Sequence, residues 1–354
     1  MKLIDVCNPK QWKTISASEL VEDGYPVFGA NGIIGYFSDY NHENPTLCIT
    51  CRGATCGTVN KSLPYSYITG NSMALDDLDE SVITIDFLYY FLQYRGFDDV
   101  ITGSAQPQIT RQSLSKITVP EIDLNIQKNI TNIIKRLEQL ILIREKQREK
   151  FNMLVKSRFN EMFGSKKFDK VSISELVDDR IETAKKKFDQ HDTIKYIDIS
   201  SIDNKNYKMT GFQEYMLNQA PSRAQQHIRK GDIVVSTVRP NLKNIAITEL
   251  DDENLVASSG FCVLRALKCL PEYLFAIICS DRFTNKMTNI VTGANYPAIK
   301  SSDIMNYIVP LPPIQLQNEF ADFVAQVDKS QLAIQKSLEE LETLKKSLMQ
   351  EYFG

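Results

Sequence analysis

The chain has 354 residues, of which 43% are hydrophobic and 24% charged, with a formal net charge of −3. This length accommodates two domains with separate cores, and the composition is typical of a globular protein. The opening segment lacks the apolar stretch of a signal peptide, and no later stretch has the roughly 18 consecutive apolar residues of a membrane span. We therefore expect a cytoplasmic protein without a membrane partner.

Seven cysteines are present, and Cys48, Cys51 and Cys56 form a C-x2-C-x4-C cluster. A zinc site would need a fourth ligand, for which His42 is the nearest residue, and no second pair follows at zinc-site spacing. The surrounding segment alternates like a buried strand, and free cysteines are usually buried. We expect structural cysteines and no metal site.

The first part of the chain, residues 1–121, is predicted to form a mixed α/β domain. Its segment GYPVFGANGIIGYF places Gly24, Gly29, Gly32 and Gly35 between short apolar runs, which predicts hairpin turns. The run FLYYFLQ after Asp86 predicts a short helix.

Residues 122–164 are predicted to form a long helix after the helix-stopping Val119-Pro120. A helix from Leu124 to about Asn160 would be roughly 55 Å long at 1.5 Å per residue. Such a length needs a partner along an apolar seam. The predicted seam residues are Ile126, Ile130, Ile133, Leu137 and Leu140.

The second half repeats this plan, with an α/β domain at residues 165–311 and a long helix at residues 312–354. The segment RKGDIVVSTVRPNLKNIAITEL predicts two strands joined by a turn at Pro240-Asn241. The run YLFAIIC after Glu272 predicts a short helix. The second seam comprises Leu316, Phe320, Phe323, Val327, Ile334, Leu338, Leu341, Leu348 and Tyr352.

The two halves form an internal repeat with a constant offset of 190 positions over their last parts. The offset runs from Thr102-Gly103 and Thr292-Gly293 to Phe163-Gly164 and Phe353-Gly354. Intervening pairs are Pro107 and Pro297, Ile109 and Ile299, Val119 and Val309, Pro120 and Pro310, and Gln127 and Gln317. The fold class is therefore α+β: two α/β domains, each followed by a long helix, related by a pseudo-two-fold repeat.

The two helices are predicted to pair with each other as an antiparallel coiled coil. The first carries nine basic and four acidic residues over 126–164, and the second carries four basic and seven acidic residues over 316–354. Opposite net charges and matched seams favour association. Packing of each helix on its own domain is the alternative.

The fronts of the halves match more loosely. Aligning LCITCRG with VVSTVRP places Thr50 on Thr237 and Arg52 on Arg239, an offset of 187. A shared end with a diverged front indicates a common task for the ends and different tasks for the fronts.

No catalytic constellation is evident. The sequence has no phosphate-binding G-x-x-x-x-G-K-[ST] loop, no amino-methyltransferase signature and only scattered histidines, at His42, His191 and His227. We expect neither a catalytic site nor a bound cofactor in this chain.

Polar and aromatic side chains of the domains are suited to contacting DNA, because Arg, Asn and Gln can each bind base edges in two places. The candidates in the first domain are Asn31, Arg52, Lys61, Tyr67, Asn71, Gln106, Gln108 and Arg111. The candidates in the second domain are Lys186, Arg223, Arg239, Asn241, Lys243, Asn295, Tyr296 and Lys300. Structural alternatives stay open: ion pairing for Arg52 and Arg239, a solvated run at Lys185–Lys187, and a half-buried sheet position for Tyr67.

The repeat, together with GSAQPQITRQSLSKITVPEIDLNIQKNI and GANYPAIKSSDIMNYIVPLPPIQLQNEF, resembles the specificity subunits of type I restriction-modification systems. The resemblance covers essentially the whole chain, and GYPVFGANGIIGYF is similar to a common opening of the family's target-recognition domains. The first copy departs from the family, reading VPEIDLNIQ where a Pro-Pro pair is usual.

This resemblance implies that each domain reads one half of a bipartite double-stranded DNA site and that the paired helices set the spacing. It implies two methyltransferase subunits and restriction/translocase subunits as partners, with S-adenosylmethionine, ATP and Mg²⁺ on those partners. Two other classes remain: a stand-alone nuclease or methyltransferase with degenerate motifs, and a coiled-coil linker whose domains bind proteins.

Overall fold

A computed structural model describes residues 1–354 except residue 31, residues 104–105, 165–166 and 179, and residues 293–296. The chain divides into two compact units. The first unit comprises Met1–Lys146 and Gln335–Gly354, and the second comprises Gln147–Ile334. Each unit therefore contains one globular head and segments of both long helices, α4 (Leu124–Phe159) and α9 (Ile314–Phe353).

The head of the first unit is a mixed α/β structure. A four-stranded antiparallel sheet has the order β1-β7-β4-β5, and a three-stranded sheet has the order β3-β2-β6. The strands are β1 (Asn8–Gln11), β2 (Tyr25–Gly29), β3 (Gly32–Phe37), β4 (Leu47–Thr50), β5 (Val59–Lys61), β6 (Tyr67–Ile68) and β7 (Ser72–Asp76). The helices of this head are α1 (Leu3–Val6), α2 (Ile85–Arg95) and α3 (Arg111–Leu114).

Two sequence predictions for this head are confirmed. The glycine-punctuated segment forms the antiparallel β2–β3 hairpin, in which Gly29 pairs with Gly32. The FLYYFLQ run lies in α2, which begins where the Thr84 hydroxyl accepts a hydrogen bond from the Phe87 amide. Helix α2 ends at Gly96, whose φ of 66° lies in the left-handed region that glycine adopts at low cost.

The head of the second unit contains a four-stranded sheet of order β12-β9-β16-β13, a three-stranded sheet β15-β14-β17, and the pairs β10-β11 and β18-β8. Its strands are β8 (Asp169–Ser172), β9 (Thr193–Ile197), β10 (Ile202–Asp203), β11 (Lys208–Met209), β12 (Gln213–Met216), β13 (Ala224–His227), β14 (Ile233–Ser236), β15 (Ile245–Ile247), β16 (Leu255–Ser258), β17 (Phe261–Leu264) and β18 (Ile308–Leu311). Its helices are α5 (Ala184–Lys187), α6 (Pro271–Ile278), α7 (Asp281–Asn289) and α8 (Ser301–Met305).

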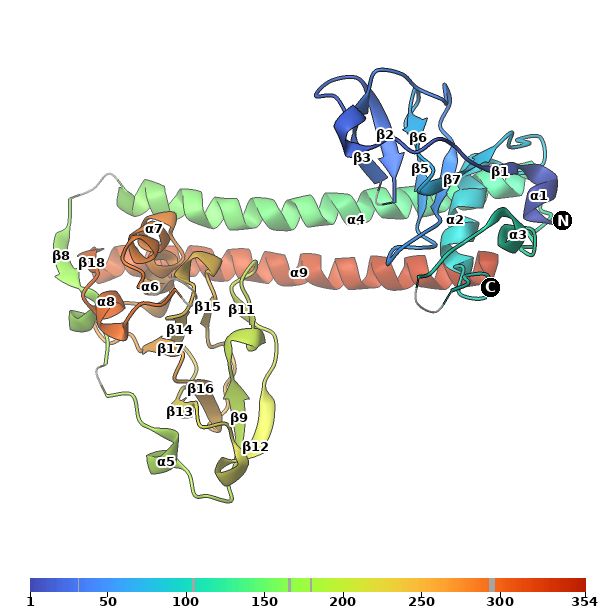
Figure 1. The fold of residues 1–354 in the computed structure, drawn as a ribbon. Helices are drawn as coiled ribbons and strands as arrows, with labels where there is room; N and C mark the ends of the chain where they lie inside the picture. Colours follow the sequence, from blue (N-terminus) through green and yellow to red (C-terminus); the bar gives the residue numbers. More distant parts are fainter. Residues whose placement is uncertain (31, 104–105, 165–166, 179, 293–296) are drawn as a thin grey trace. The chain divides into compact units, whose positions relative to one another are not determined.

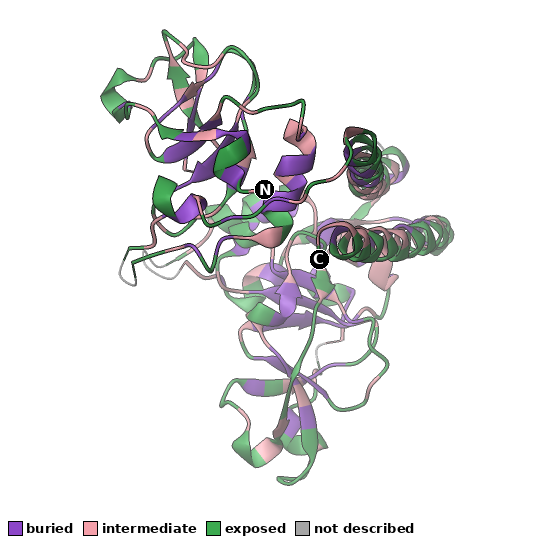
Figure 2. Cartoon of the chain, turned by 90° about the vertical axis from the view of Figure 1, so that its right-hand side faces the viewer, coloured by how far each residue is buried: buried purple, intermediate pink, exposed green. Residues whose placement is uncertain are grey.

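The predicted strand–turn–strand of this head is confirmed as β14 and β15, which pair antiparallel around a 3-10 turn, η6 (Pro240–Leu242). The YLFAIIC run lies in α6 except for its last residue, Cys279, which caps the helix; α6 has proline at its first position. Buried residues concentrate in the strands of each head, as the colouring by burial shows (Figure 2).

Segments of α4 and α9 lie beside each other in each unit (Figure 1). In the first unit, Glu138 of α4 accepts a hydrogen bond of 2.7 Å from Lys345 of α9, and Met349 shares a core with Ile134. In the second unit, Gln331 of α9 donates to Asn152 of α4. Residue numbers rise along α9 where they fall along α4, so the predicted antiparallel pairing is confirmed.

The end of each helix completes the core of one unit. Phe353 contacts Phe87 and Phe91 of α2 in the first unit, with ring centroids 5.2 and 6.2 Å apart. Phe163, in the π-helical turn Asn160–Gly164 that continues α4, contacts Tyr273 and Phe320 in the second unit, with ring centroids 5.1 and 5.7 Å apart. Each head is therefore closed by the helix end of the other repeat.

The predicted α4 seam is partly wrong. Ile130 and Leu137 are buried, but Ile126, Ile133 and Leu140 are 52%, 40% and 46% exposed. At about 100° per residue, these three lie to one side of the buried face formed by Gln127, Ile130, Ile134 and Leu137. The apolar stripe of α4 is therefore wider than the surface that α4 buries: one side of the stripe packs into the core of the unit, and the other side is exposed.

A buried glutamine attaches each long helix to its head. Gln127 accepts a hydrogen bond from the Thr84 amide and donates to the carbonyls of Val82 and Ile122, all at 2.8 Å. Its repeat equivalent Gln317 accepts from the Leu270 amide and donates to the Pro312 carbonyl, also at 2.8 Å. These bonds fix the first turn of each helix against the loop before α2 or α6.

The cysteine cluster lies within the first head. Cys48 and Cys51 are buried, Cys56 is partly buried, and all are free thiols. Burial raises the pKa of the Cys48 thiol to about 12, which disfavours the thiolate that binds metal. Among the described residues, no group of three or more metal-ligating side chains is placed to hold an ion. No helix in the described part of the chain combines the length and apolarity needed to cross a membrane.

Candidate nucleic-acid interface

Four predicted DNA-contacting residues of the first head gather where β4 ends. Arg52 forms an isolated antiparallel bridge with Gln108, and the Cys51 amide donates to the Asn71 carbonyl at 3.1 Å. Gln106 lies two residues before Gln108 and is exposed, as are Arg52 and Asn71. We call Arg52, Asn71, Gln106 and Gln108 the first strand-end cluster.

The tip of the β2–β3 hairpin is held beside this cluster. The Thr50 hydroxyl donates to the Ala30 carbonyl at 2.5 Å, and the Ser72 hydroxyl donates to the Gly29 carbonyl at 2.8 Å. The predicted residue Asn31 follows Ala30 in the chain and lies outside the described residues. Two hydroxyl groups thus connect this tip to the ends of β4 and β7.

Four predicted residues of the second head gather where β14 ends. The Ser259 amide donates to the Arg223 carbonyl at 2.8 Å, and the Thr237 amide donates to the Gly260 carbonyl at 3.0 Å. Arg239 and Asn241 continue from β14, and Lys300 precedes α8. Arg223, Arg239, Asn241 and Lys300 are exposed, and we call them the second strand-end cluster. The predicted Asn295 and Tyr296 directly precede Pro297 and lie outside the described residues.

Equivalent backbone hydrogen bonds build the two clusters. The Ile109 amide donates to the Cys51 carbonyl at 3.0 Å, and the Ile299 amide donates to the Thr237 carbonyl at 2.9 Å. The Gly53 amide donates to the Pro107 carbonyl at 3.3 Å, and the Arg239 amide donates to the Pro297 carbonyl at 2.8 Å. Between the two heads, Ile109 and Pro107 correspond to Ile299 and Pro297 at an offset of 190. Their bonding partners, Cys51 and Gly53, correspond to Thr237 and Arg239 at an offset of 186.

The predicted front alignment is therefore wrong by one residue. Thr50 corresponds to Ser236 and Arg52 corresponds to Val238, whereas Arg239 occupies the position of Gly53. Both Gly53 and Arg239 have a left-handed backbone, with φ of 87° and 49°. The sequence alignment was set by the identical residues Arg52 and Arg239. The equivalent backbone hydrogen bonds instead pair Arg239 with Gly53.

Other predicted residues lie in different surroundings. The ammonium group of Lys61 lies 2.7 Å from Asp86, which also pairs with Lys135. The Tyr67 hydroxyl donates to the Lys13 carbonyl at 3.2 Å, and its half-buried ring packs edge-on to Phe37. Arg111 begins α3 and Lys186 lies in α5, and both are exposed. Lys61 and Tyr67 thus have structural partners within the head.

Lys243 also has a partner within its head. Its ammonium group lies 2.5 Å from Asp281, the first residue of α7. The hydrogen bond from Lys243 lowers the pKa of Asp281. Partial burial opposes the rise in the pKa of Lys243, but the bond to Asp281 raises it nonetheless. Each member of this pair therefore stabilises the charged form of the other.

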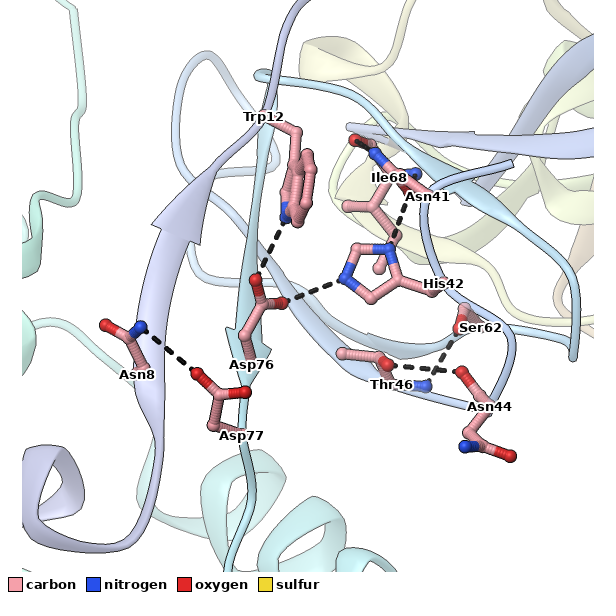
Figure 3. Close-up of polar contacts among 10 residues, drawn as sticks. All are labelled: Asn8, Trp12, Asn41, His42, Asn44, Thr46, Ser62, Ile68, Asp76 and Asp77. Carbon is pink, nitrogen blue, oxygen red and sulfur yellow. Dashed lines mark hydrogen bonds and ion pairs between the residues drawn. The ribbon is translucent and has the colours of Figure 1, made fainter. Parts of the chain in front are cut away.

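A cavity of about 400 Å³ lies near the start of β4 in the first head, and its walls include none of the predicted residues that the structure describes. Its walls include Trp12, His42 and Asp76 together with acidic Glu43 and Glu80. Asp76 accepts hydrogen bonds from the Trp12 indole at 3.1 Å and from His42 Nε2 at 2.9 Å (Figure 3). An acid-lined wall repels phosphate, so this cavity does not favour a DNA backbone.

The same network fixes the loop before β4. His42 Nδ1 lies 2.6 Å from Asn41 Oδ1, and Asn41 forms two hydrogen bonds with the Ile68 backbone (Figure 3). Sequence reasoning missed this network, because its members are far apart in the chain and match no motif. It also missed the left-handed backbone of Arg239, because the matching arginines hid the equivalence of Arg239 with Gly53.

Two α/β heads with strand-end clusters in equivalent positions, each completed by a long helix of the other repeat, define a protein with two repeated domains and paired long helices. The family model for the type I restriction modification DNA specificity domain matches residues 1–152 and 165–344. The chain belongs to this family.

Named relatives agree with the family assignment. The chain is 23% identical over 308 residues to the type I restriction enzyme MjaVIII specificity subunit of Methanocaldococcus jannaschii, covering 78% of this chain and 72% of the relative. It is 31% identical over 119 residues to the EcoprrI specificity subunit of Escherichia coli, covering 32% and 29% of the two chains.

A solved structure shares the fold along the entire chain. The type I restriction-modification S subunit from M. genitalium aligns with a TM-score of 0.61 and 15% identity, covering 100% of this chain and 95% of that chain. At this identity, the likeness shows that the two proteins have the same fold.

Proposed function

We propose that the chain gives a type I restriction-modification complex its DNA sequence specificity, with each head reading one half of a bipartite site. The observation that carries this proposal is the pair of strand-end clusters, placed by equivalent hydrogen bonds at the ends of β4 and β14. Exposed Arg, Asn and Gln side chains are suited to base edges. Their differences between the heads would give two different half-sites.

The paired helices would set the spacing between the half-sites and hold two methyltransferase subunits. Support comes from the apolar strip Ile126, Ile133 and Leu140, which repeats every seven residues on α4 and is exposed. Apolar residues in such a pattern fit an apolar partner surface. The family's role in DNA modification makes a methyltransferase the partner that we propose for this strip.

This chain would supply recognition and leave chemistry to its partners. The family that it matches is a DNA specificity domain. Methyl transfer with S-adenosylmethionine, and restriction with ATP and Mg²⁺, would then occur on the methyltransferase and restriction/translocase subunits. Such a role requires access to host DNA, so we place the protein in the cytoplasm.

Methylation mapping tests the function directly. The chain is produced together with its methyltransferase subunit, and the host DNA is sequenced for modified adenines. We expect a bipartite motif that requires this chain and that loses one half when the first head is exchanged. A control without the chain sets the background. An unchanged methylome, with an active methyltransferase that binds the chain, would instead favour the protein-binding linker.

A further inference from the structure

Arg239 has a left-handed backbone conformation, and the equivalent residue in the first repeat is a glycine, Gly53. The amides of Gly53 and Arg239 bond to the carbonyls of Pro107 and Pro297, and both residues have positive φ. Glycine adopts this region without steric cost, whereas a residue with a Cβ is strained there. The second head therefore keeps an arginine where the first head has the residue that the backbone favours.

The contacts of Arg239 do not account for this strain. Its side chain is exposed, and no hydrogen bond or ion pair of its guanidinium group occurs with the described residues. Lys243, four residues later, has a similar φ of 52° but holds Asp281 at 2.5 Å. The strained backbone at Lys243 thus supports an ion pair within the head, whereas the strained backbone at Arg239 presents an exposed side chain to solvent.

The neighbours of Arg239 give this position a basic, polar surface. Arg223, Asn241 and Lys300 are exposed in the same strand-end cluster. The backbone at this position is held on both sides. The Thr237 amide bonds to Gly260, the Arg239 amide bonds to Pro297, and the next residue, Pro240, is buried. A side chain presented from a fixed backbone meets a ligand without the cost of ordering the loop, so only the side chain's own freedom is lost on binding.

We propose that Arg239 reads the edge of a guanine in the second half-site. A guanidinium group donates two parallel hydrogen bonds to guanine O6 and N7, which no other base edge accepts in the same way. The first head has no side chain at this position, so it reads its half-site without an equivalent contact. This inference rests on the proposed function and identifies the residue that distinguishes the two heads.

Two substitutions test the proposal by methylation mapping of the chain produced with its methyltransferase subunit. Arg239→Gly removes the side chain and the strain together, so we expect an equal or higher Tm of the purified chain. We expect discrimination at one guanine of the second half-site to fall about tenfold or more, with the first half-site unchanged. Arg239→Lys keeps the charge but loses the two-donor geometry, and we expect the same relaxed position.

The proposal for Arg239 is overturned if the second half-site contains no G·C pair, or if both variants keep the wild-type motif. It is also overturned if Arg239→Gly reduces methylation uniformly with every position still specified while Arg239→Lys restores it, because that pattern indicates a phosphate contact. Failure of the proposed function gives a different result, since wild-type chain would then direct no bipartite motif.

Discussion

The buried amide of Gln127 should contribute more stability to the first unit than any exposed polar group of α4. The side chain is fully buried and makes three hydrogen bonds of 2.8 Å. Gln127→Met preserves the approximate volume but leaves the Thr84 amide and the Val82 and Ile122 carbonyls without these partners. At about 1–3 kcal/mol for each unsatisfied buried group, with part regained by relaxation, we expect a loss of about 2–5 kcal/mol.

Hydrogen exchange measured by mass spectrometry locates this loss, because it reports each unit separately. We expect protection of the first-unit strands to fall by about 100-fold, since 1.4 kcal/mol corresponds to a factor of ten. Gln139→Met is the matched control, because Gln139 lies on the same helix and is exposed. A Gln127→Met variant that costs under about 1 kcal/mol, or no more than the control, refutes the reasoning.

A charge variant tests the direction of these hydrogen bonds. Gln127→Glu would replace the donating nitrogen with an oxygen facing the Val82 and Ile122 carbonyls. Repulsion and burial would raise the pKa of the new carboxyl group above its ordinary value. The folded state would then bind more protons than the unfolded state, so stability should increase as pH falls. Stability that decreases toward acid pH, relative to Gln127→Met, would contradict the assigned bonding.

Three further predictions concern stability. Phe163→Ala should destabilise the second unit by about 3–5 kcal/mol, measured by hydrogen exchange, because Phe163 is buried in that core although it ends the first repeat. Burial lowers the pKa of His227 below its ordinary value of 6.5, against the hydrogen bond to the Glu253 carbonyl, so protonating the ring costs more in the folded than in the unfolded state. Its stabilising contribution is present above pH 6.5 and lost as pH falls, and His227→Gln should flatten the acid limb of a stability–pH curve. Lys345→Ala should cost at most about 1 kcal/mol in chemical denaturation, because Lys345 and Glu138 are both partly exposed.

The elements that the sequence predicts are those set by local patterns. The β2–β3 hairpin follows from glycines at close spacing, and α4 was expected over 124–160 and is found at Leu124–Phe159. The repeat was evident because its last part has no insertion, so Gln127 and Gln317 align without a gap. Helix pairing followed from length, since a 36-residue helix with an apolar stripe requires a partner.

The remaining features depend on contacts between distant segments. The alignment of Arg52 with Arg239 rested on identical letters, while the equivalence of Gly53 and Arg239 appears only in hydrogen bonds to the prolines after the loop. The buried side of α4 was not predictable, because Ile126 and Ile130 have the same apolarity and only packing distinguishes them. The charge complementarity expected between the helices is also reversed at one contact: in the Glu138–Lys345 ion pair, the acid lies on the net-basic helix and the base on the net-acidic one.

The separation of core and cluster residues has a consequence for exchanging heads. Phe353 contacts Phe87 and Phe91, and Gln127 bonds to the loop before α2, so any replacement of residues 1–121 must keep this receiving surface. The exposed residues of the first strand-end cluster are not part of that surface. Because the two sets share no residue, the cluster positions can change while the helix contacts stay constant. The diverged fronts and shared ends of the repeat have this division of roles as their physical basis.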